Sequence, residues 1–174
     1  MVGEVMAADY RAIIEEIEKQ TDRGAAIIGA ALVDDVLARA ILGKFISLSS
    51  TKKKALFGGS GPLGTYQAKI DLAYALGLLT DAMATDFKLI GSVRNKFAHR
   101  PTAIGFSDKD IADLCSNLKT GQIDKEEDWV KEPRNMYIAA CTTLVAVLTL
   151  IEVDRIDEET MVLERSLAER LEPK

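Results

Sequence analysis

Apolar residues recur every three or four positions along most of this 174-residue chain. That spacing gathers them on one side of an α-helix and is the main sequence signal for helical structure. The clearest stripe consists of Phe87, Ile90, Val93 and Phe97. Pro101 disfavours helical geometry at the residue before it, so this helix is expected to end beside His99. The chain is therefore predicted to be all-α, a single-domain bundle of several helices.

The same spacing predicts the other helices. They are expected over residues 6–20, 23–46, 65–78, 107–118 and 133–153. Thr80 or Asp81 can cap the helix that carries the stripe, and Ser107 with Asp110 fits a capping arrangement for the helix that follows it. Pro133 suits the first turn of the last helix, which is strongly apolar and is expected at the centre of the bundle.

A long glycine-rich connection is expected between Leu48 and Gly64, where the helical pattern stops. It contains three consecutive lysines at 52–54, which are expected to form a solvated edge, and then the glycine-rich segment 58–64. A phosphate-binding loop would follow a strand and continue into Gly-Lys-Ser/Thr, and this segment does neither. We therefore favour glycines that let the backbone pass close to neighbouring helices or to a dimer seam.

Composition and charge narrow the class of protein. Hydrophobic residues make up 48% of the chain and charged residues 28%, as in ordinary globular proteins, and no repeat or domain boundary is visible. One domain is therefore expected over residues 1–174, with an amphipathic tail at about 154–174. The net charge of −5 argues against a free-standing DNA-binding protein, because phosphate contacts require a basic surface.

The cysteines and the apolar C-terminal run indicate a reducing, aqueous compartment. Cys115 and Cys141 lie in apolar helical patterns and form no CxxC or Cys/His cluster, so buried thiols are expected and no metal or other cofactor. Residues 138–153 are interrupted by threonines and by Glu152, which favours a buried helix over a membrane span. The first residues lack the pattern of a secretory leader. We therefore expect a cytoplasmic protein without a membrane segment.

The segment with the strongest claim to chemistry is Arg94-Asn95-Lys96-Phe97-Ala98-His99, which ends in the only histidine of the chain. Asn95 and His99 stand at i and i+4 and share a helix face, whereas Arg94 and His99 lie about 140° apart around the helix. One interpretation is structural: His99 caps the helix end, and Arg94 pairs with an acidic residue. The other is phosphate chemistry, in which arginine binds a phosphoryl oxygen and histidine moves a proton.

Four segments stand out in colinear order within residues 21–118. They are the run from Arg23 to Asp34, the glycine-rich segment from Leu56 to Gly64, the segment from Lys69 to Leu78, and the hexapeptide at 94–99. Together they resemble the mannitol operon repressor (MtlR) family. The resemblance implies an all-helical regulator without a recognisable DNA-binding module, which agrees with the absence of a basic recognition helix here.

The hexapeptide also resembles the Arg-x4-His signature of HEPN-type helical domains, and Arg94, Asn95 and His99 match it position by position. This resemblance implies metal-independent RNA cleavage at a dimer cleft. Arg94 would bind the scissile phosphate, His99 would act as general acid or base, and Asn95 would orient the substrate or the histidine. The acidic balance and the scarcity of aromatic residues depart from that expectation.

The sequence therefore predicts a cytoplasmic transcriptional regulator of the mannitol repressor type. We expect a homodimer that acts through a protein partner and does not bind DNA sequence-specifically. A metal-independent HEPN-like ribonuclease, with RNA as its substrate, is the first alternative. The second is an antitoxin-like or structural binding module, in which Arg94, Asn95 and His99 fix a dimer interface.

Overall fold

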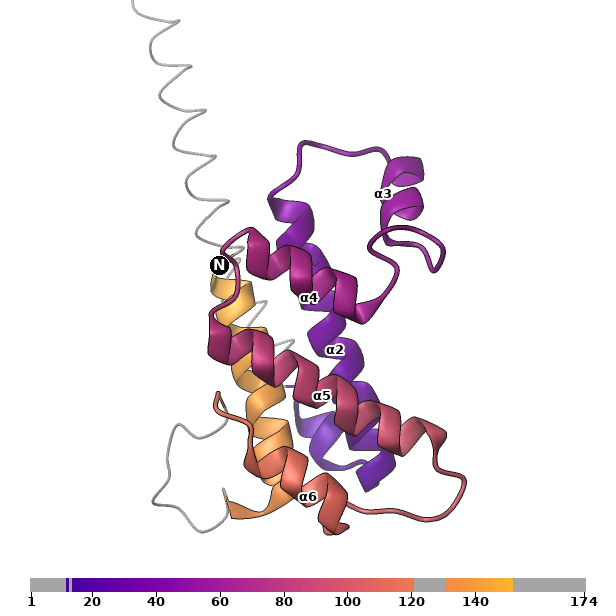
Figure 1. The fold of residues 1–174 in the computed structure, drawn as a ribbon, viewed down its shortest axis with the longest axis vertical. Coiled ribbons are helices and arrows are strands. Elements are labelled where there is room, and N and C mark those ends of the chain that lie inside the picture. The colour runs from indigo at the N-terminus through magenta and orange to yellow at the C-terminus, as the bar shows by residue number, and fades with distance from the viewer. Residues whose placement is uncertain (1–11, 13, 121–130, 152–174) are drawn as a thin grey trace, which may run out of the picture.

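The computed structural model describes residues 12, 14–120 and 131–151, and within these ranges it contains helices and no strand (Figure 1). The helices are α2 (Asp22–Gly43), α3 (Ser50–Phe57), α4 (Tyr66–Ala75), α5 (Asp81–His99) and α6 (Lys109–Ser116). A further long helix spans Pro133–Ile151, and residues 14–18 are also helical. The prediction of an all-α, multi-helix bundle is confirmed. The predicted tail at about 154–174 and most of the predicted helix before residue 14 lie outside the described ranges.

The bundle is built around α2 and α5, which pack on each other, while α4 packs against both and α6 packs on α5. The helix Pro133–Ile151, drawn in orange and yellow, runs behind α5 in Figure 1. The core joins these helices through a row of aromatic rings. The ring centroids of Phe97 and Phe106 are 5.0 Å apart, and those of Phe106 and Tyr137 are 5.3 Å apart. The hydroxyl of Tyr137 donates to the carbonyl of Ala26 at 2.7 Å, which ties the last helix to α2.

Local signals set the ends of α5 as predicted, whereas α2, α4 and α6 end two or three residues before the predicted positions 46, 78 and 118. The Thr80 side chain accepts a hydrogen bond from the N–H of Met83 and caps α5, which ends at His99. Gly77, just after the C-terminal end of α4, has a φ of +71°. Glycine adopts this left-handed conformation without strain, and it commonly ends a helix. Pro133 is the first residue of the last helix, where its missing N–H costs no hydrogen bond.

The prediction of an extended connection is wrong over Ser50–Phe57, which forms α3. The Ser49 side chain accepts a hydrogen bond from the N–H of Lys52, and lysine is a good helix former. No residue of α3 is buried, so this helix lacks the apolar stripe by which the others were recognised. Its three lysines are exposed, as expected. After α3 the glycine segment folds back, and a side chain at Gly61 would collide with the carbonyl of Ala55.

The predicted cap of α6 by Ser107 and Asp110 is also wrong. α6 begins at Lys109 after Asp108, whose carboxylate accepts from the N–H of Gly105 at 2.6 Å. Asp110 instead forms ion pairs with Lys96 and Arg100, from the end of α5 and the residue after it. A hydrogen bond between two charged groups is stronger than one to a neutral N–H, so the carboxylate turns toward these cations.

The two cysteines are free thiols buried in the core, as predicted. Burial raises the pKa of the Cys115 thiol to about 12, and it raises the pKa of Cys141 as well. The helix Pro133–Ile151 is the one described helix that is long and apolar enough to cross a membrane, and 44% of its apolar window is buried inside the bundle. Leu144 and Leu148 are fully buried, which agrees with a core helix.

Candidate functional site

The three residues singled out in the sequence lie on α5 but do not share one surface. Asn95 and His99 are exposed, and neither side chain forms a hydrogen bond or ion pair with any residue that the structure describes. Arg94 is half-buried and lines a cavity between helices. Successive helical residues are about 100° apart, so Arg94 projects away from the face that carries the other two. The acidic partner considered for Arg94 is not found within the described part of the chain.

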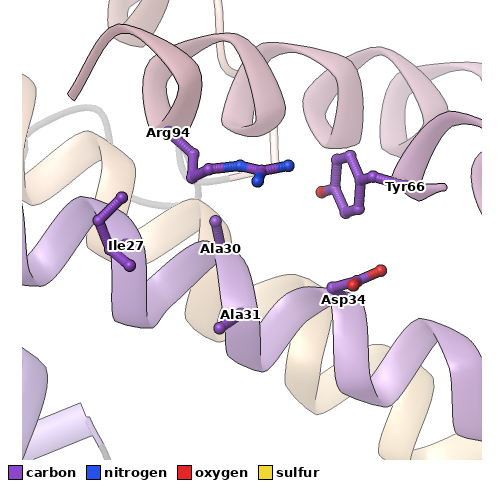
Figure 2. A pocket seen from close by; sticks show the side chains of 6 residues that line it. All are labelled: Ile27, Ala30, Ala31, Asp34, Tyr66 and Arg94. Carbon is purple, nitrogen blue, oxygen red and sulfur yellow. The ribbon is translucent and has the colours of Figure 1, made fainter. Parts of the chain in front are cut away.

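The cavity beside Arg94 has a volume of about 180 Å³ and lies between α2, α4 and α5 (Figure 2). It is lined by Ile27, Ala30, Ala31, Asp34, Tyr66 and Arg94. The small side chains of two alanines on α2 leave the space open. Figure 2 shows Arg94 and Tyr66 extending toward each other, with Asp34 on the facing side of α2. We call this space the Arg94 cavity.

The charged guanidinium of Arg94 lies over the aromatic ring of Tyr66. The guanidinium carbon of Arg94 lies 6.0 Å from the centroid of the Tyr66 ring, within the range of a cation–π interaction. The Tyr66 hydroxyl is buried and has no hydrogen-bond partner among the described residues. Burial raises the pKa of Tyr66 well above its ordinary value, and the nearby Cys141 and Asp34 add to this while Arg94 opposes it. The hydroxyl is therefore protonated at neutral pH and available as a donor.

Asp34 is already neutralised from another side. Its carboxylate forms an ion pair with Lys69 of α4, whose side chain is almost completely buried. Burying an ammonium group is costly unless it is paired with an opposite charge, so Lys69 needs Asp34 as its partner. The ion pair therefore links α4 to α2. The positive charge of Arg94 is consequently the unbalanced charge at the Arg94 cavity.

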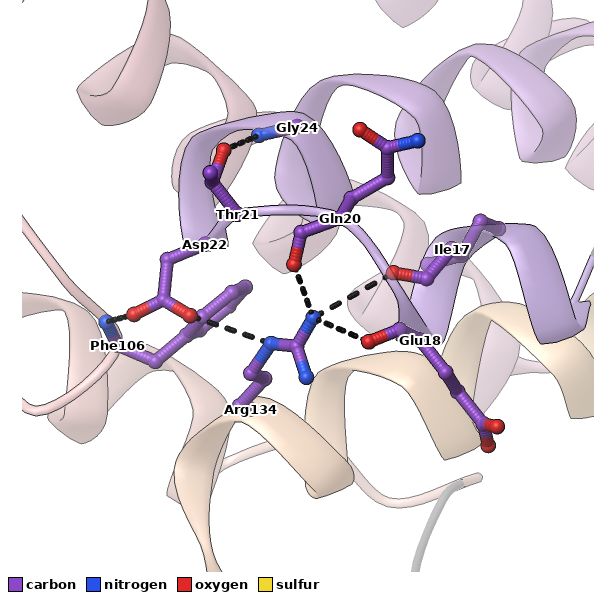
Figure 3. Close-up of polar contacts among 8 residues, drawn as sticks. All are labelled: Ile17, Glu18, Gln20, Thr21, Asp22, Gly24, Phe106 and Arg134. Atoms are coloured by element: carbon purple, nitrogen blue, oxygen red, sulfur yellow. Dashed lines mark hydrogen bonds and ion pairs between the residues drawn. The ribbon is translucent and has the colours of Figure 1, made fainter.

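A second polar cluster lies at the start of α2 and is structural (Figure 3). One terminal nitrogen of Arg134 donates to the carbonyls of Glu18 at 3.0 Å and Gln20 at 2.7 Å, with a longer contact to Ile17 at 3.4 Å. Its Nε lies 3.1 Å from a carboxylate oxygen of Asp22. The other oxygen of Asp22 accepts from the N–H of Phe106 at 2.9 Å. We call this group the Arg134 cluster.

The sequence analysis did not single out Tyr66, Lys69 or Arg134. No local signal could have found them, because their partners come from other helices. Along α2 itself, the ion pair is made by Asp35, the neighbour of Asp34, with Arg39 at 3.4 Å. No group of three or more histidine, cysteine, aspartate or glutamate side chains placed to hold a metal ion occurs in the described ranges.

Comparison with known proteins gives the family. The sequence pattern of the mannitol repressor (MtlR) family matches residues 44–151. A chain of the MtlR–HPr complex from Escherichia coli superposes with a TM-score of 0.61 at 18% identity, covering 81% of this chain and 98% of that one. A possible transcriptional regulator, YggD from Shigella flexneri, gives a TM-score of 0.62 at 16% identity, covering 80% and 96%. No curated protein sequence matches significantly. Because the family pattern spans more than half of its length, the chain belongs to the mannitol repressor family.

Proposed function

We propose that this protein is a transcriptional regulator of the mannitol repressor type that acts by binding another protein. The family match over residues 44–151 is the observation that carries the proposal. The similar folds of the chain from the MtlR–HPr complex and of the possible transcriptional regulator support it. The protein works in the cytoplasm, where a regulator of transcription meets its target.

The charge of the chain favours a protein partner over direct reading of DNA. The net charge is −5, and three of the basic residues are concentrated on α3, where Lys52, Lys53 and Lys54 are exposed. Affinity for duplex DNA depends strongly on the number of phosphates that basic side chains neutralise, and this contribution falls as the salt concentration rises. Three lysines on one short helix therefore support only weak binding that salt suppresses.

The partner that we propose is the HPr protein of the same cell, because the similar Escherichia coli structure is a complex with HPr. Isothermal titration of the full chain with purified HPr is expected to give a saturable complex. A mobility-shift assay with the cognate operator at physiological salt is expected to show little binding by the chain alone. Absence of an HPr complex would remove this partner, and tight sequence-selective DNA binding would overturn the partner-dependent mechanism.

We also propose that the chain forms a homodimer. Sedimentation equilibrium of the purified protein is expected to give twice the chain mass of 19.0 kDa, and a monomer at all concentrations would contradict the proposal. The variant His99→Ala tests whether the hexapeptide has an interface role or a catalytic role. Dissociation of the dimer would place His99 in an interface, as the structural binding module requires.

Cleavage of RNA is a second candidate function, favoured by the exposure of Asn95 and His99 on the last turns of α5. Both side chains are accessible to a substrate, whereas Arg94, which would bind the phosphate, is half-buried and projects from another side of the same helix. Purified protein in EDTA would then cleave RNA and leave 2′,3′-cyclic phosphate ends. His99→Ala and Arg94→Ala should each abolish that activity while keeping the fold, and Lys88→Ala on the same helix is the control. Equal cleavage by all four proteins would exclude the site.

A further inference from the structure

We propose that the Arg94 cavity is a binding site for a small organic anion, in which a carboxylate or phosphate group contacts Arg94 and accepts a hydrogen bond from Tyr66. This inference is independent of the proposed protein partner. It rests on three features of the cavity: an unpaired guanidinium, an unpaired buried hydroxyl, and empty space that both groups reach.

The guanidinium of Arg94 has donors to spare. It carries five N–H groups in a planar fork, and none of them makes a hydrogen bond to a described residue. Its contact with Tyr66 is made through the face of the ring, at 6.0 Å from the centroid, and it leaves the edge of the guanidinium unused. Carboxylate and phosphate oxygens match that edge with two parallel hydrogen bonds. An oxyanion is therefore the group that this arginine is suited to hold.

The Tyr66 hydroxyl sets a second contact point. A buried hydroxyl without an acceptor is costly, and native proteins rarely leave one unless a ligand or water completes it. The hydroxyl is protonated and can donate, and the neighbouring guanidinium of Arg94 is itself only a donor, so a group that contacts both must be an acceptor. Its partner in a ligand is consequently an oxygen, and the same oxyanion that faces Arg94 supplies one.

Charge and volume limit the ligand further. Lys69 balances Asp34, so Arg94 leaves the cavity with one net positive charge, which favours an anion over a neutral or cationic molecule. Asp34 can accept a hydrogen bond from a ligand hydroxyl, which favours a hydroxylated carbon chain. The volume of about 180 Å³ is well below the usual range of roughly 300–1,000 Å³ for drug-sized ligands. A short hydroxylated acid or phosphate ester fits these limits.

Three probes that share a three-carbon skeleton test the proposal. Glycerate carries a carboxylate, glycerol 3-phosphate carries a phosphate, and glycerol carries neither. Each is titrated into the full-length protein in a low-salt buffer without phosphate, and binding is followed by calorimetry and by ligand-detected NMR. At least one of the anions is expected to bind, and glycerol is not. The anion that binds more tightly decides between a carboxylate and a phosphate ligand.

Variants then locate the binding. Arg94→Gln is expected to weaken the anion by about tenfold or more, because it removes the charged fork. Tyr66→Phe is expected to weaken it by about fivefold, because it removes one donor. Lys88→Gln removes a positive charge from an exposed position on the same helix and is expected to leave affinity unchanged. Failure of both anions to bind at about 10 mM would overturn the proposal, as would equal binding by wild type and Arg94→Gln.

Discussion

Two half-buried arginines of this bundle have opposite surroundings. Arg134 is held by three backbone carbonyls and the carboxylate of Asp22, all in place within the protein (Figure 3). Arg94 faces an aromatic ring and an empty cavity, and no described carboxylate or carbonyl pairs with it (Figure 2). The difference shows that half-burial alone does not mark an arginine as structural. What decides its role is whether the fold itself supplies acceptors for its donors.

The Arg134 cluster has a mechanical consequence. Residues 17–20 comprise the end of the helix at 14–18 and the turn before α2, and Arg134, on the helix Pro133–Ile151, binds three of their carbonyls. Arg23 makes a similar link on the other side, donating to the carbonyls of Phe97, Arg100 and Thr102. Arg134 therefore links the start of α2 to the helix Pro133–Ile151. Arg23 links it to the end of α5 and to the segment that follows His99.

The largest effect is expected from Arg134→Met, which keeps much of the side-chain volume and removes all donors. The carbonyls of residues 17–20 and the Asp22 carboxylate would lose a charged partner, and the unfolding free energy should fall by roughly 2 kcal/mol. Urea denaturation of wild type and variant measures the difference. Arg94→Met is the matched control and should change stability by less than about 0.5 kcal/mol. Equal losses of stability from the two substitutions would show that Arg94 contributes as much to the fold as Arg134 does.

A smaller effect is expected from Arg23→Met. Two of its three acceptors, the carbonyls of Arg100 and Thr102, are exposed and water can reach them once the arginine is gone, so the loss should be about 1 kcal/mol. Amide hydrogen exchange should also become faster over residues 100–106, which the arginine anchors to α2. Unchanged exchange there would show that the segment is held by packing of Phe106 and not by Arg23.

Tyr66→Phe should leave stability unchanged or raise it by up to about 1 kcal/mol, because the hydroxyl it removes is buried without a partner. Thermal denaturation in a buffer without organic anions provides the measurement. Tyr137→Phe is the matched control, since that hydroxyl does donate, to the carbonyl of Ala26, and its loss should destabilise the protein. Destabilisation by Tyr66→Phe would mean that its hydroxyl has an internal acceptor.

The smallest effect concerns Asp110, a half-buried carboxylate. The hydrogen bond from Lys96 lowers the pKa of Asp110 below its ordinary value of 3.8; desolvation opposes this shift, and the charge of Arg100 adds to it. A lowered folded-state pKa means that the stabilisation is complete above pH 3.8 and is lost as the pH falls through the folded-state value. Asp110→Asn should therefore flatten the acid end of the stability curve. Asp113→Asn, at an exposed position of α6, serves as control.

Prediction from sequence succeeded where a signal lies within a few residues. The stripe on α5, its end at His99 and a cap at Thr80 or Asp81 were predicted, and the structure has Thr80 as the cap; apolar spacing and capping act over one or two helical turns. α3 was missed because it buries no residue and so shows no stripe. The cap of α6 was misassigned because Asp110 binds cations that α5 brings to it, which capping patterns do not include.

The candidate site was predicted only in part. Arg94, Asn95 and His99 were selected together as a motif, and helix geometry places them on one element. Their surroundings differ, since Arg94 meets Tyr66 and Asp34 whereas Asn95 and His99 are exposed. The cavity depends on side chains from three helices, so no spacing within a single segment could indicate it. The catalytic and interface roles of this motif stay predictions that the RNA and sedimentation experiments decide.

The sequence by itself determined the helical class, the approximate positions of most helices, the burial of both cysteines and the membership of the mannitol repressor family. These features follow from the spacing of apolar residues, from capping residues and from a family sequence pattern, all of which can be recognised in the sequence alone. Only the tertiary structure decided which polar groups meet. Arg134 reaches a carbonyl 117 residues away, whereas Arg94 is left facing open space. The physical reason is that a donor's acceptors are chosen by how helices pack, and packing joins segments that the chain keeps far apart.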